Sequence, residues 1–246
     1  MTILIFAHMI LDILAFGAHP DDVELAAGAT LAKQVFLGNS IGIVDLTRGE
    51  LGTRGTPEIR DLEAIDAAKI LGASARENLC FKDGFFQIDE FHQRKIIEVI
   101  RKYRPKLVLA NAPNDRHPNH GRAAKLVVEA CFLAGLRQIE TRIDGQLQDP
   151  WRPSNVLHYI QFYDLKPDFI FDVTGFWNTK MQAVLAHKSQ FYNPNSNEPP
   201  TVISSKGFLD SLSNRASELG RLIGTEHGEG FIKTRDFGVN NLLDLI

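Results

Sequence analysis

The sequence predicts an α/β protein with a Rossmann-like, three-layer fold, in which helices cover both faces of a mostly parallel sheet. Three observations support this prediction. The chain has 246 residues, of which 44% are hydrophobic and 23% are charged, and this composition is ordinary for one large globular domain. Short apolar runs alternate with helical patterns through the first half of the chain. Clusters of polar side chains directly follow two of those runs, where open α/β folds bind their ligands.

The first half of the chain carries the clearest alternation of strand and helix patterns. Buried strands are expected at residues 12–16, 41–46, 79–81 and 106–110. Helices are expected at residues 25–37, 57–71, 91–103 and 121–136. Pro57 suits a first helical turn, and Gly72 suits a helix end. Because a helix follows each strand, we expect parallel strands joined by crossover connections.

The second half of the chain is less regular. Strands are expected at residues 156–162 and 169–173, the latter at a sheet edge. Helices are expected at residues 177–190 and 209–223. Residues 193–200 are rich in Asn and Pro and form a loop that is too short for a domain linker. We therefore expect a single domain over residues 1–246.

Charge and composition exclude several classes of protein. Lys and Arg number 27 and Asp and Glu number 30, so the net charge is −3 and no basic excess indicates a nucleic-acid partner. No stretch reaches the roughly 18 apolar residues of a membrane span. Cys80 and Cys131 form no CxxC motif. We expect both to be small buried side chains in a reducing compartment, with no disulfide or zinc framework.

The N-terminal segment imitates a signal peptide but lacks its charge pattern. Residues 1–17 are largely apolar, yet they contain no Lys or Arg and are interrupted by Asp12. We therefore expect a cytoplasmic protein. Met9 could be the natural start, and residues 1–8 are expected to be a dispensable extension.

Two polar clusters follow expected strands at matching positions. The first contains His19, Asp21 and Asp22, and the second contains His117 and His120. If the two strands are neighbours, both loops meet in one crevice at the carboxyl edge of the sheet. His19, Asp22 and His120 then supply two imidazoles and one carboxylate, a set that suits zinc or iron(II). The alternative is that an Asp only caps the following helix.

The two clusters together resemble a known family. Residues 18–24, Ala-His-Pro-Asp-Asp-Val-Glu, and residues 117–120, His-Pro-Asn-His, are similar to the zinc-dependent de-N-acetylases of the PIG-L/LmbE type. Residues 48–56 and 187–192 resemble its short bacterial branch, which includes the bacillithiol-biosynthesis deacetylase acting on N-acetylglucosaminyl malate. The resemblance covers most of the chain. One departure is Asn119, where the family often has Asp, at a position not expected to bind metal.

The resemblance implies a role for each residue of the two clusters. It assigns metal binding to His19, Asp22 and His120, with Zn²⁺ as the cofactor and Fe²⁺ as the alternative. Asp21 matches the general base that accepts a proton from the attacking water. His117 matches the residue that stabilises the tetrahedral oxyanion. The resemblance also implies an LmbE-like fold and a homo-oligomer that acts on a small amino-sugar substrate, with no membrane partner.

The resemblance also offers candidates for contacts with the substrate. Arg54, Arg116 and Tyr192 are candidates for contacts with the substrate and the oxyanion. The alternatives are solvated surface arginines and, for Tyr192, ordinary packing. His187 is expected to be structural. Glu24 is expected to be a first-turn carboxylate that favours the helix dipole, and not a ligand.

Three other interpretations stay open. A mononuclear metallo-phosphoesterase would also use His and Asp, although such enzymes often need two metals and ligands for only one are apparent. A nucleotide-binding module is weakly supported, because neither GxGxxG nor a Walker A motif follows the first strand. Within the deacetylases the aglycone is open: two arginines suit a dicarboxylate such as malate, and a chito-oligosaccharide or another amino-sugar conjugate is the alternative.

Overall fold

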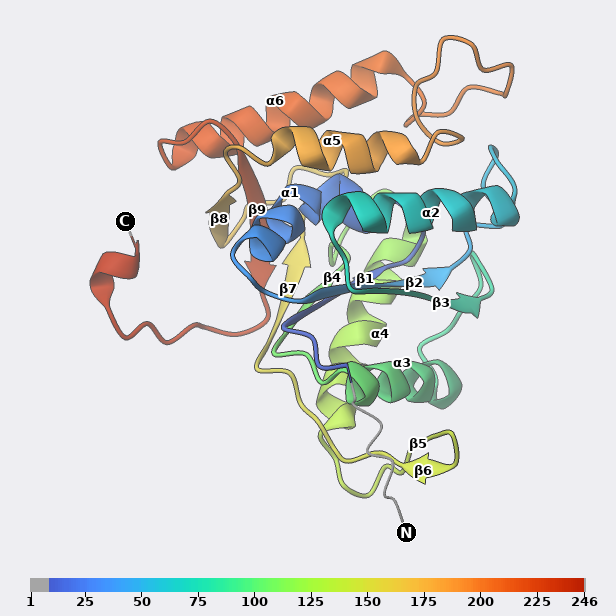
Figure 1. Ribbon diagram of the computed structural model, residues 1–246, viewed down its shortest axis with the longest axis vertical. Helices are drawn as coiled ribbons and strands as arrows, with labels where there is room; N and C mark the ends of the chain where they lie inside the picture. The colour runs from blue at the N-terminus through green and yellow to red at the C-terminus, as the bar shows by residue number, and fades with distance from the viewer. Residues whose placement is uncertain (1–8, 246) are drawn as a thin grey trace.

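The computed structural model describes residues 9–245 and contains one seven-stranded sheet (Figure 1). The strand order is β3-β2-β1-β4-β7-β9-β8. The strands are β1 (Ile13–Gly17), β2 (Ile41–Thr47), β3 (Ala75–Phe81), β4 (Leu107–Ala110), β7 (Asn155–Tyr159), β8 (Phe169–Asp172) and β9 (Gly228–Lys233). A small hairpin outside this sheet is formed by β5 (Arg142–Ile143) and β6 (Gln146–Leu147). Strands β3, β2, β1, β4 and β7 run parallel, whereas β9 is antiparallel to both of its neighbours.

Helices cover both faces of the sheet. They are α1 (Asp22–Phe36), α2 (Pro57–Leu71), α3 (Glu90–Tyr103), α4 (Pro118–Ala134), α5 (Trp177–Ala186) and α6 (Lys206–Leu222), with a short 3-10 helix at Leu242–Leu245. Figure 1 shows α1, α2, α5 and α6 on one side and α3 and α4 on the other. The side chains of β1 alternate between two apolar cores: Leu14 and Phe16 pack towards α3 and α4, and Ile13 and Ala15 towards α1 and α2. The predicted three-layer, mostly parallel α/β fold is confirmed.

The order of the strands brings the two polar clusters together. Strand β1 pairs directly with β4, in a parallel register that sets Ile13 opposite Leu107 and Ala15 opposite Leu109. The segments that follow these two strands therefore leave the sheet at the same carboxyl edge. The sequence analysis expected the two polar clusters to meet in one crevice if their strands were neighbours, and β1 and β4 are neighbours.

One interior strand was missed in the sequence. Strand β9 lies between β7 and β8, where no strand was expected. Its sequence gives little strand signal because it contains Gly228 and Gly230. A Cβ at Gly228 would lie 2.6 Å from the Ile170 side chain and 3.0 Å from the backbone of α6. These glycines therefore allow α6 to pack closely on the sheet. Because glycine has no side chain, they also interrupt the apolar pattern by which a strand is recognised in a sequence.

Several expected boundaries also change. Helix α1 begins at Asp22 and not at residue 25, β3 begins at Ala75 and not at residue 79, and α5 ends at Ala186 and not at residue 190. Strand β8 lies at the end of the sheet, as predicted.

The expectation for the cysteines is half right. Cys131 is buried, but Cys80 is exposed. The register between β2 and β3 shifts near Cys80, and one extra residue on β3 forms a bulge there. Cys80 has a positive φ of 52°, and the bulge turns Phe81 into the core instead.

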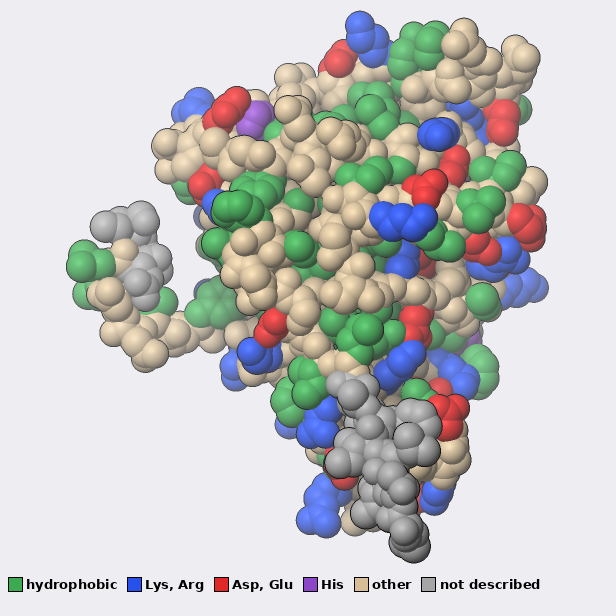
Figure 2. Space-filling model, in the orientation of Figure 1, with side chains coloured by type: hydrophobic (Ala, Val, Ile, Leu, Met, Phe, Trp, Pro, Cys, Tyr) green, Lys and Arg blue, Asp and Glu red, His purple; other side chains and the backbone are tan. Residues whose placement is uncertain are grey.

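The remaining general features concern the surface and the ends. Figure 2 shows Lys and Arg side chains interspersed with Asp and Glu on the visible face. Among residues 9–245, no helix has the length and apolar character needed to cross a membrane. The expected dispensable extension, residues 1–8, lies outside the described residues and stays a prediction, as does the single-domain assignment.

Candidate active site

A cavity of about 570 Å³ opens at the carboxyl edge of the sheet. Its floor is formed by the segments that follow β1 and β4, and one wall is formed by residues 202–215, which run into α6. This volume lies within the range of pockets that hold small-molecule ligands, roughly 300–1,000 Å³. Six of the predicted site residues line it, namely His19, Asp21, Asp22, Arg116, His117 and His120.

The turn between β1 and α1 holds two carboxylates in different ways. Asp21 has φ 119° and ψ −26°, a left-handed conformation that is rare without glycine and costs of order 1–3 kcal/mol. It occupies the N-cap position of α1, yet its side chain makes no capping hydrogen bond. The Asp22 carboxylate instead accepts a hydrogen bond of 3.0 Å from the backbone N–H of His19. The alternative that these aspartates only cap the helix is therefore wrong.

The Asp22 carboxylate is fixed from several directions. The Asn111 side-chain amide donates to one oxygen at 3.0 Å, and the Gln161 amide donates to the other at 2.9 Å. Asn111 follows β4 and Gln161 follows β7, so three adjacent strands contribute to holding one side chain. Asp22 is 3% exposed and has little freedom to reorient.

Two imidazoles face Asp22, and each is oriented by a second carboxylate. His120 Nδ1 donates to Asp115 Oδ2 at 2.6 Å, and its Nε2 lies 3.1 Å from Asp22 Oδ1. His19 Nε2 lies 3.2 Å from Asp83 Oδ1, and its Nδ1 lies 3.6 Å from Asp22 Oδ2. In metal sites, a histidine ligand usually donates the N–H of its second ring nitrogen to a carboxylate, which fixes the orientation of the ring. Asp115 and Asp83 are placed to do this for His120 and His19.

This donor set fits a divalent cation. His19, His117 and His120 each offer a ring nitrogen, and these three nitrogens lie within 4.8 Å of one another. The contacts of Asp22 with two of the rings make it a further possible ligand. Three histidines could thus hold a metal ion, and the set of His19, Asp22 and His120 stays a prediction.

The adjacent carboxyls of Asp21 and Asp22 differ in acidity. Burial raises the pKa of Asp21 to about 6, against the opposing influence of the Arg60 guanidinium. Burial also acts to raise the pKa of Asp22, but His120 and His19 outweigh it and hold this pKa well below its usual range. Neighbouring acids with separated pKa values are typical of sites in which one group moves protons and the other stays ionised.

His117 is held as a neutral imidazole with one defined donor. Burial lowers its pKa to about 4, and His19 and His120 act in the same direction. As the N-cap residue of α4, it accepts a hydrogen bond from the Asn119 backbone N–H at its Nδ1, at 3.2 Å. The remaining proton of the neutral ring is therefore on Nε2, which can donate a hydrogen bond to a ligand in the cavity.

The three candidates for substrate contacts lie in different places. Arg116 lines the cavity, with its guanidinium 5.0 Å from the centre of the Phe162 ring. Arg54 is buried outside the cavity lining and donates to Ser196 Oγ at 2.7 Å. Tyr192 is exposed and also lies outside the lining. The structure therefore brings only Arg116 of these three to the cavity.

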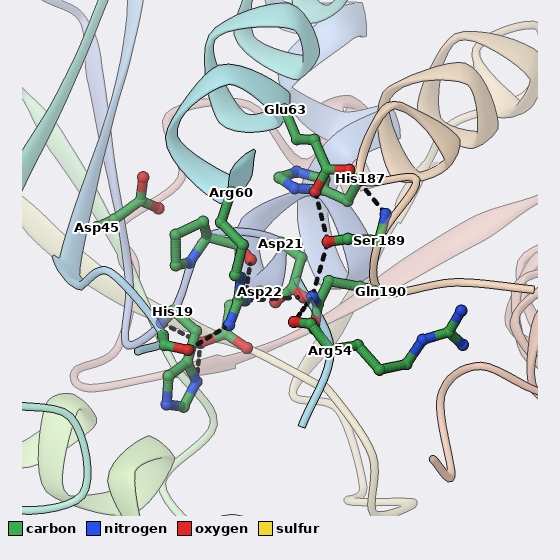
Figure 3. A network of polar contacts seen from close by, with 12 residues as sticks. His19, Asp21, Asp22, Asp45, Arg54, Arg60, Glu63, His187, Ser189 and Gln190 are labelled. Atoms are coloured by element: carbon green, nitrogen blue, oxygen red, sulfur yellow. Dashed lines mark hydrogen bonds and ion pairs between the residues drawn. The ribbon is translucent and has the colours of Figure 1, made fainter. Parts of the chain in front are cut away.

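His187, which is labelled in Figure 3, and Glu24 belong to a buried network of polar side chains. Glu24 is fully buried, forms an ion pair with Arg76, and lies 3.3 Å from His187 Nε2. Arg76 also bonds Asp45 on β2 at 2.8 and 3.0 Å. Glu24 thus joins the first turn of α1 to the sheet, and neither it nor His187 lines the cavity.

Sequence reasoning missed several polar residues of the site. Asp83 follows β3 and Gln161 follows β7, so the rule that identified the two polar clusters could also have found them. Asp115 lies inside the loop already singled out. Arg60 reaches the site from helix α2, and no local pattern marks such a residue.

Comparisons with known proteins agree with this geometry. Residues 14–131 match the family PIG-L, GlcNAc-PI de-N-acetylase. The diacetylchitobiose deacetylase of Thermococcus kodakarensis is 30% identical over 189 residues, which are 73% of this chain and 70% of the relative. A probable N-acetyl-alpha-D-glucosaminyl L-malate deacetylase 2 of Bacillus cereus is 25% identical over 197 residues, 72% and 83% of the two chains. The crystal structure of a conserved protein from Thermus thermophilus superposes with a TM-score of 0.82, at 35% identity over 94% of this chain and 98% of that one.

Proposed function

The chain belongs to the PIG-L family of deacetylases, and on that premise we propose that it is a metal-dependent hydrolase that removes the N-acetyl group from an N-acetylglucosamine conjugate. The observation that carries this proposal is the cavity floor. There, His19 and His120 are each oriented by an outer carboxylate and face Asp22, while Asp21 lies beside them without a capping bond. Such a floor suits hydrolysis assisted by a divalent metal.

In this proposal His19, Asp22 and His120 hold the metal, with Zn²⁺ as the expected ion and Fe²⁺ as the alternative. The bound metal would polarise the acetamide carbonyl and acidify the attacking water. Asn111 and Gln161 keep the Asp22 carboxylate in place, and Asp83 and Asp115 do the same for the two imidazoles. The metal would then meet ligands that are already oriented.

Asp21 is the proposed general base. Its carboxylate lines the cavity next to the proposed ligand Asp22, and it is mostly ionised at neutral pH because its pKa is about 6. It can therefore accept the proton of the attacking water and later deliver a proton to the leaving amine. A base with a pKa near the working pH serves both steps.

His117 is the proposed oxyanion donor. Its Nδ1 accepts the Asn119 N–H, so Nε2–H is free to donate to the carbonyl oxygen as negative charge develops there. Because the N-cap position of α4 fixes this ring, little reorganisation is needed as the charge appears.

For the substrate we propose N-acetylglucosaminyl malate, as in bacillithiol biosynthesis. Arg116 lines the cavity and can bind a carboxylate with bidentate geometry, and the Bacillus cereus relative carries the name of a malate-conjugate deacetylase. The role proposed for Arg54 and Tyr192 is weaker, since neither lines the cavity. Diacetylchitobiose is the alternative substrate, favoured by the Thermococcus relative.

The proposal also includes a cytoplasmic location and a homo-oligomer. Both are expectations from the sequence. Sedimentation of the purified protein would measure its oligomeric state.

Acetate release from a panel of N-acetylglucosaminides, with and without a chelator, tests the proposed function. The panel would contain the malate conjugate, diacetylchitobiose and free N-acetylglucosamine, together with a phosphomonoester. We expect chelator-sensitive acetate release, fastest from the malate conjugate. Phosphate release instead would favour the metallo-phosphoesterase, and the absence of any hydrolysis would favour a binding module.

A further inference from the structure

A dicarboxylate aglycone carries two negative charges, and Arg116 supplies one cation to the cavity. Arg54 was expected to supply the second, but it does not line the cavity. Among residues 9–245, the lysine and arginine side chains that do line it are Arg60, Arg116 and Arg215. Arg60 reaches the floor, where its Nη2 lies 3.3 Å from Asp21 Oδ2. Arg215 belongs to α6 in the wall, the side of the cavity that an aglycone extending from the floor would meet.

The Arg215 guanidinium has N–H donors that its protein contacts leave unused. Its Nη2 donates to the Phe162 carbonyl oxygen at 2.7 Å and lies 3.2 Å from Asp164 Oδ1. Among the described residues, no hydrogen bond or ion pair engages its Nε or Nη1. The Asp164 side chain is 92% exposed, and an ion pair with such an exposed group is weak. Because a guanidinium has five donors, Arg215 can bind a carboxylate and keep its bond to the Phe162 carbonyl.

Phe162 brings the two guanidiniums of Arg116 and Arg215 to one place. The Arg116 guanidinium lies 5.0 Å from the centre of the Phe162 ring, and Arg215 binds the carbonyl oxygen of the same residue. All three residues line the cavity. The Phe162 ring also stacks on Phe208 of α6, with 6.4 Å between the ring centres and 13° between the planes. The segments after β4 and β7 therefore meet α6 at Phe162, and two of them bring a cation there.

The wall favours an anion more than the rest of the cavity does. Residues 202–215 contribute no carboxylate to the lining, whereas its other segments contribute Asp21, Asp22, Asp83 and Asp115. Phe208, Leu212 and Arg215 follow one another at helical spacing and share one face of α6. The apolar side chains beside Arg215 lower the local dielectric constant, which strengthens a hydrogen bond from its charged group.

We propose that Arg215 is a specificity-determining residue that binds one carboxylate of a dicarboxylate aglycone, while Arg116 binds the other. This inference rests on the proposed function, since it concerns the aglycone of the same substrate. Arginine suits this task because its planar fork matches the geometry of a carboxylate. The loss of Arg215 should therefore weaken the binding of an aglycone that has two carboxylates and should matter little for a substrate that has none.

The test compares three substrates that differ in the charge of the aglycone. These are the malate conjugate with two carboxylates, the corresponding lactate conjugate with one, and free N-acetylglucosamine with none. In Arg215→Ala we expect kcat/KM on the malate conjugate to fall about ten- to a hundredfold, mostly through KM, because one charge-assisted hydrogen bond contributes about that much. The malate conjugate should then be no better a substrate than the lactate conjugate. The loss on free N-acetylglucosamine should be much smaller.

A second variant separates carboxylate binding from a structural role. Arg215→Gln keeps an amide donor for the Phe162 carbonyl but carries no charge. We expect its kcat/KM on the malate conjugate to fall as far as that of Arg215→Ala, with thermal unfolding close to that of the wild type. The matched control is Arg221→Ala. Arg221 lies on the same helix, is 67% exposed and pairs with Glu218 outside the cavity lining, so its loss should leave kcat/KM unchanged on all three substrates.

The outcomes separate this inference from the proposed function. If the wild-type protein releases acetate from none of these substrates and not from diacetylchitobiose, the proposed function fails and this inference fails with it. If the wild-type protein is active, the role of Arg215 alone is overturned by an unchanged preference for the malate conjugate in Arg215→Ala. Equal losses on all three substrates, or wild-type kinetics in Arg215→Gln, also overturn it, because Arg215 would then only hold α6 in place.

Discussion

The floor and the wall of the cavity are built differently. On the floor, Asp22 is fixed by hydrogen bonds from three segments that are distant in sequence, and His19 and His120 are each oriented by a second carboxylate. On the wall, the hydrogen bonds of residues 201–208 join close neighbours, as between Thr201 and Ser204. The wall presents the apolar side chains of Val202, Ile203, Phe208 and Leu212 to the cavity, next to Ser205, Ser211 and Arg215.

We infer from this difference that the floor carries out the reaction and that the wall selects the substrate. A catalytic group must keep its position within a fraction of an ångström, and cross-linking between distant segments provides this. Residues 201–208 of the wall, which are held by local hydrogen bonds, can change in sequence without disturbing the floor, as loops on a rigid scaffold often do. We therefore expect substitutions on the floor to abolish the reaction, and substitutions on the wall to alter which conjugate is preferred.

The largest expected effect follows from removing a proposed ligand. His19→Ala and His120→Ala should each lose stoichiometric metal and all measurable deacetylation, because two remaining ligands bind a divalent ion weakly. Metal analysis of the purified variants, with thermal unfolding to confirm the fold, measures this. Full metal occupancy in both variants would contradict the ligand assignment.

The next effect isolates the proposed base. Asp21→Asn should keep the metal and lose roughly 10²–10⁴-fold in kcat, the usual contribution of a general base. The substitution is nearly isosteric and keeps an oxygen for Arg60 to contact. Turnover close to the wild-type value would show that another group takes the proton.

The third effect concerns the carboxylate behind His120. Asp115→Asn removes the charge that faces His120 Nδ1 at 2.6 Å, and we expect a loss of about 10–100-fold in metal affinity or activity. Asp149→Asn, at an exposed position, is the control. Titration of the metal-free variants and wild type with Zn²⁺ measures their affinities for the metal. Equal Zn²⁺ affinities in Asp115→Asn and the wild type would show that Asp115 has only a structural role.

The fourth effect lies at the border between floor and wall. A charge-assisted hydrogen bond contributes about 1.5–3 kcal/mol, so Arg116→Ala should cost roughly ten- to a hundredfold in kcat/KM on the malate conjugate. The loss on neutral N-acetylglucosamine should be much smaller. Arg116→Lys keeps the charge without the bidentate geometry, so its kcat/KM on the malate conjugate should lie between the values of the wild type and of Arg116→Ala. Equal losses on both substrates would leave the malate preference without support.

The smallest effect is expected for an apolar residue of the wall. Val202 is 52% exposed and lines the cavity, so Val202→Ser should leave the fold and the metal unaffected. Partial loss of an apolar contact is worth about 1 kcal/mol, which corresponds to about fivefold in KM for a conjugate that reaches the wall. Free N-acetylglucosamine, which lacks an aglycone, is the matched comparison. A loss in kcat with every substrate would show that the wall shares in the chemistry.

The sequence predicted the parts of the molecule that depend on local pattern. The fold class followed from the alternation of strands and helices, and the two polar clusters were found because they directly follow β1 and β4. The prediction was incomplete where segments distant in sequence determine the position of a residue. Arg54 was expected at the cavity, but the fold turns it to Ser196. Arg60 reaches the site from a helix, and no spacing rule connects it to Asp21.

The place of β9 inside the sheet has a consequence for how the chain folds. Residues 228–233 are synthesised late, yet β9 is the strand on which β8 pairs, and it borders β7 as well. Its Glu229 also takes hydrogen bonds from Thr30 on α1, a contact that spans 199 positions of sequence. Until this strand emerges from the ribosome, the nascent chain exposes an edge of β7 and leaves β8 unpaired. Completion of the sheet is therefore a late event with high contact order. Until it occurs, the unpaired edges of β7 and β8 can pair with other chains and aggregate.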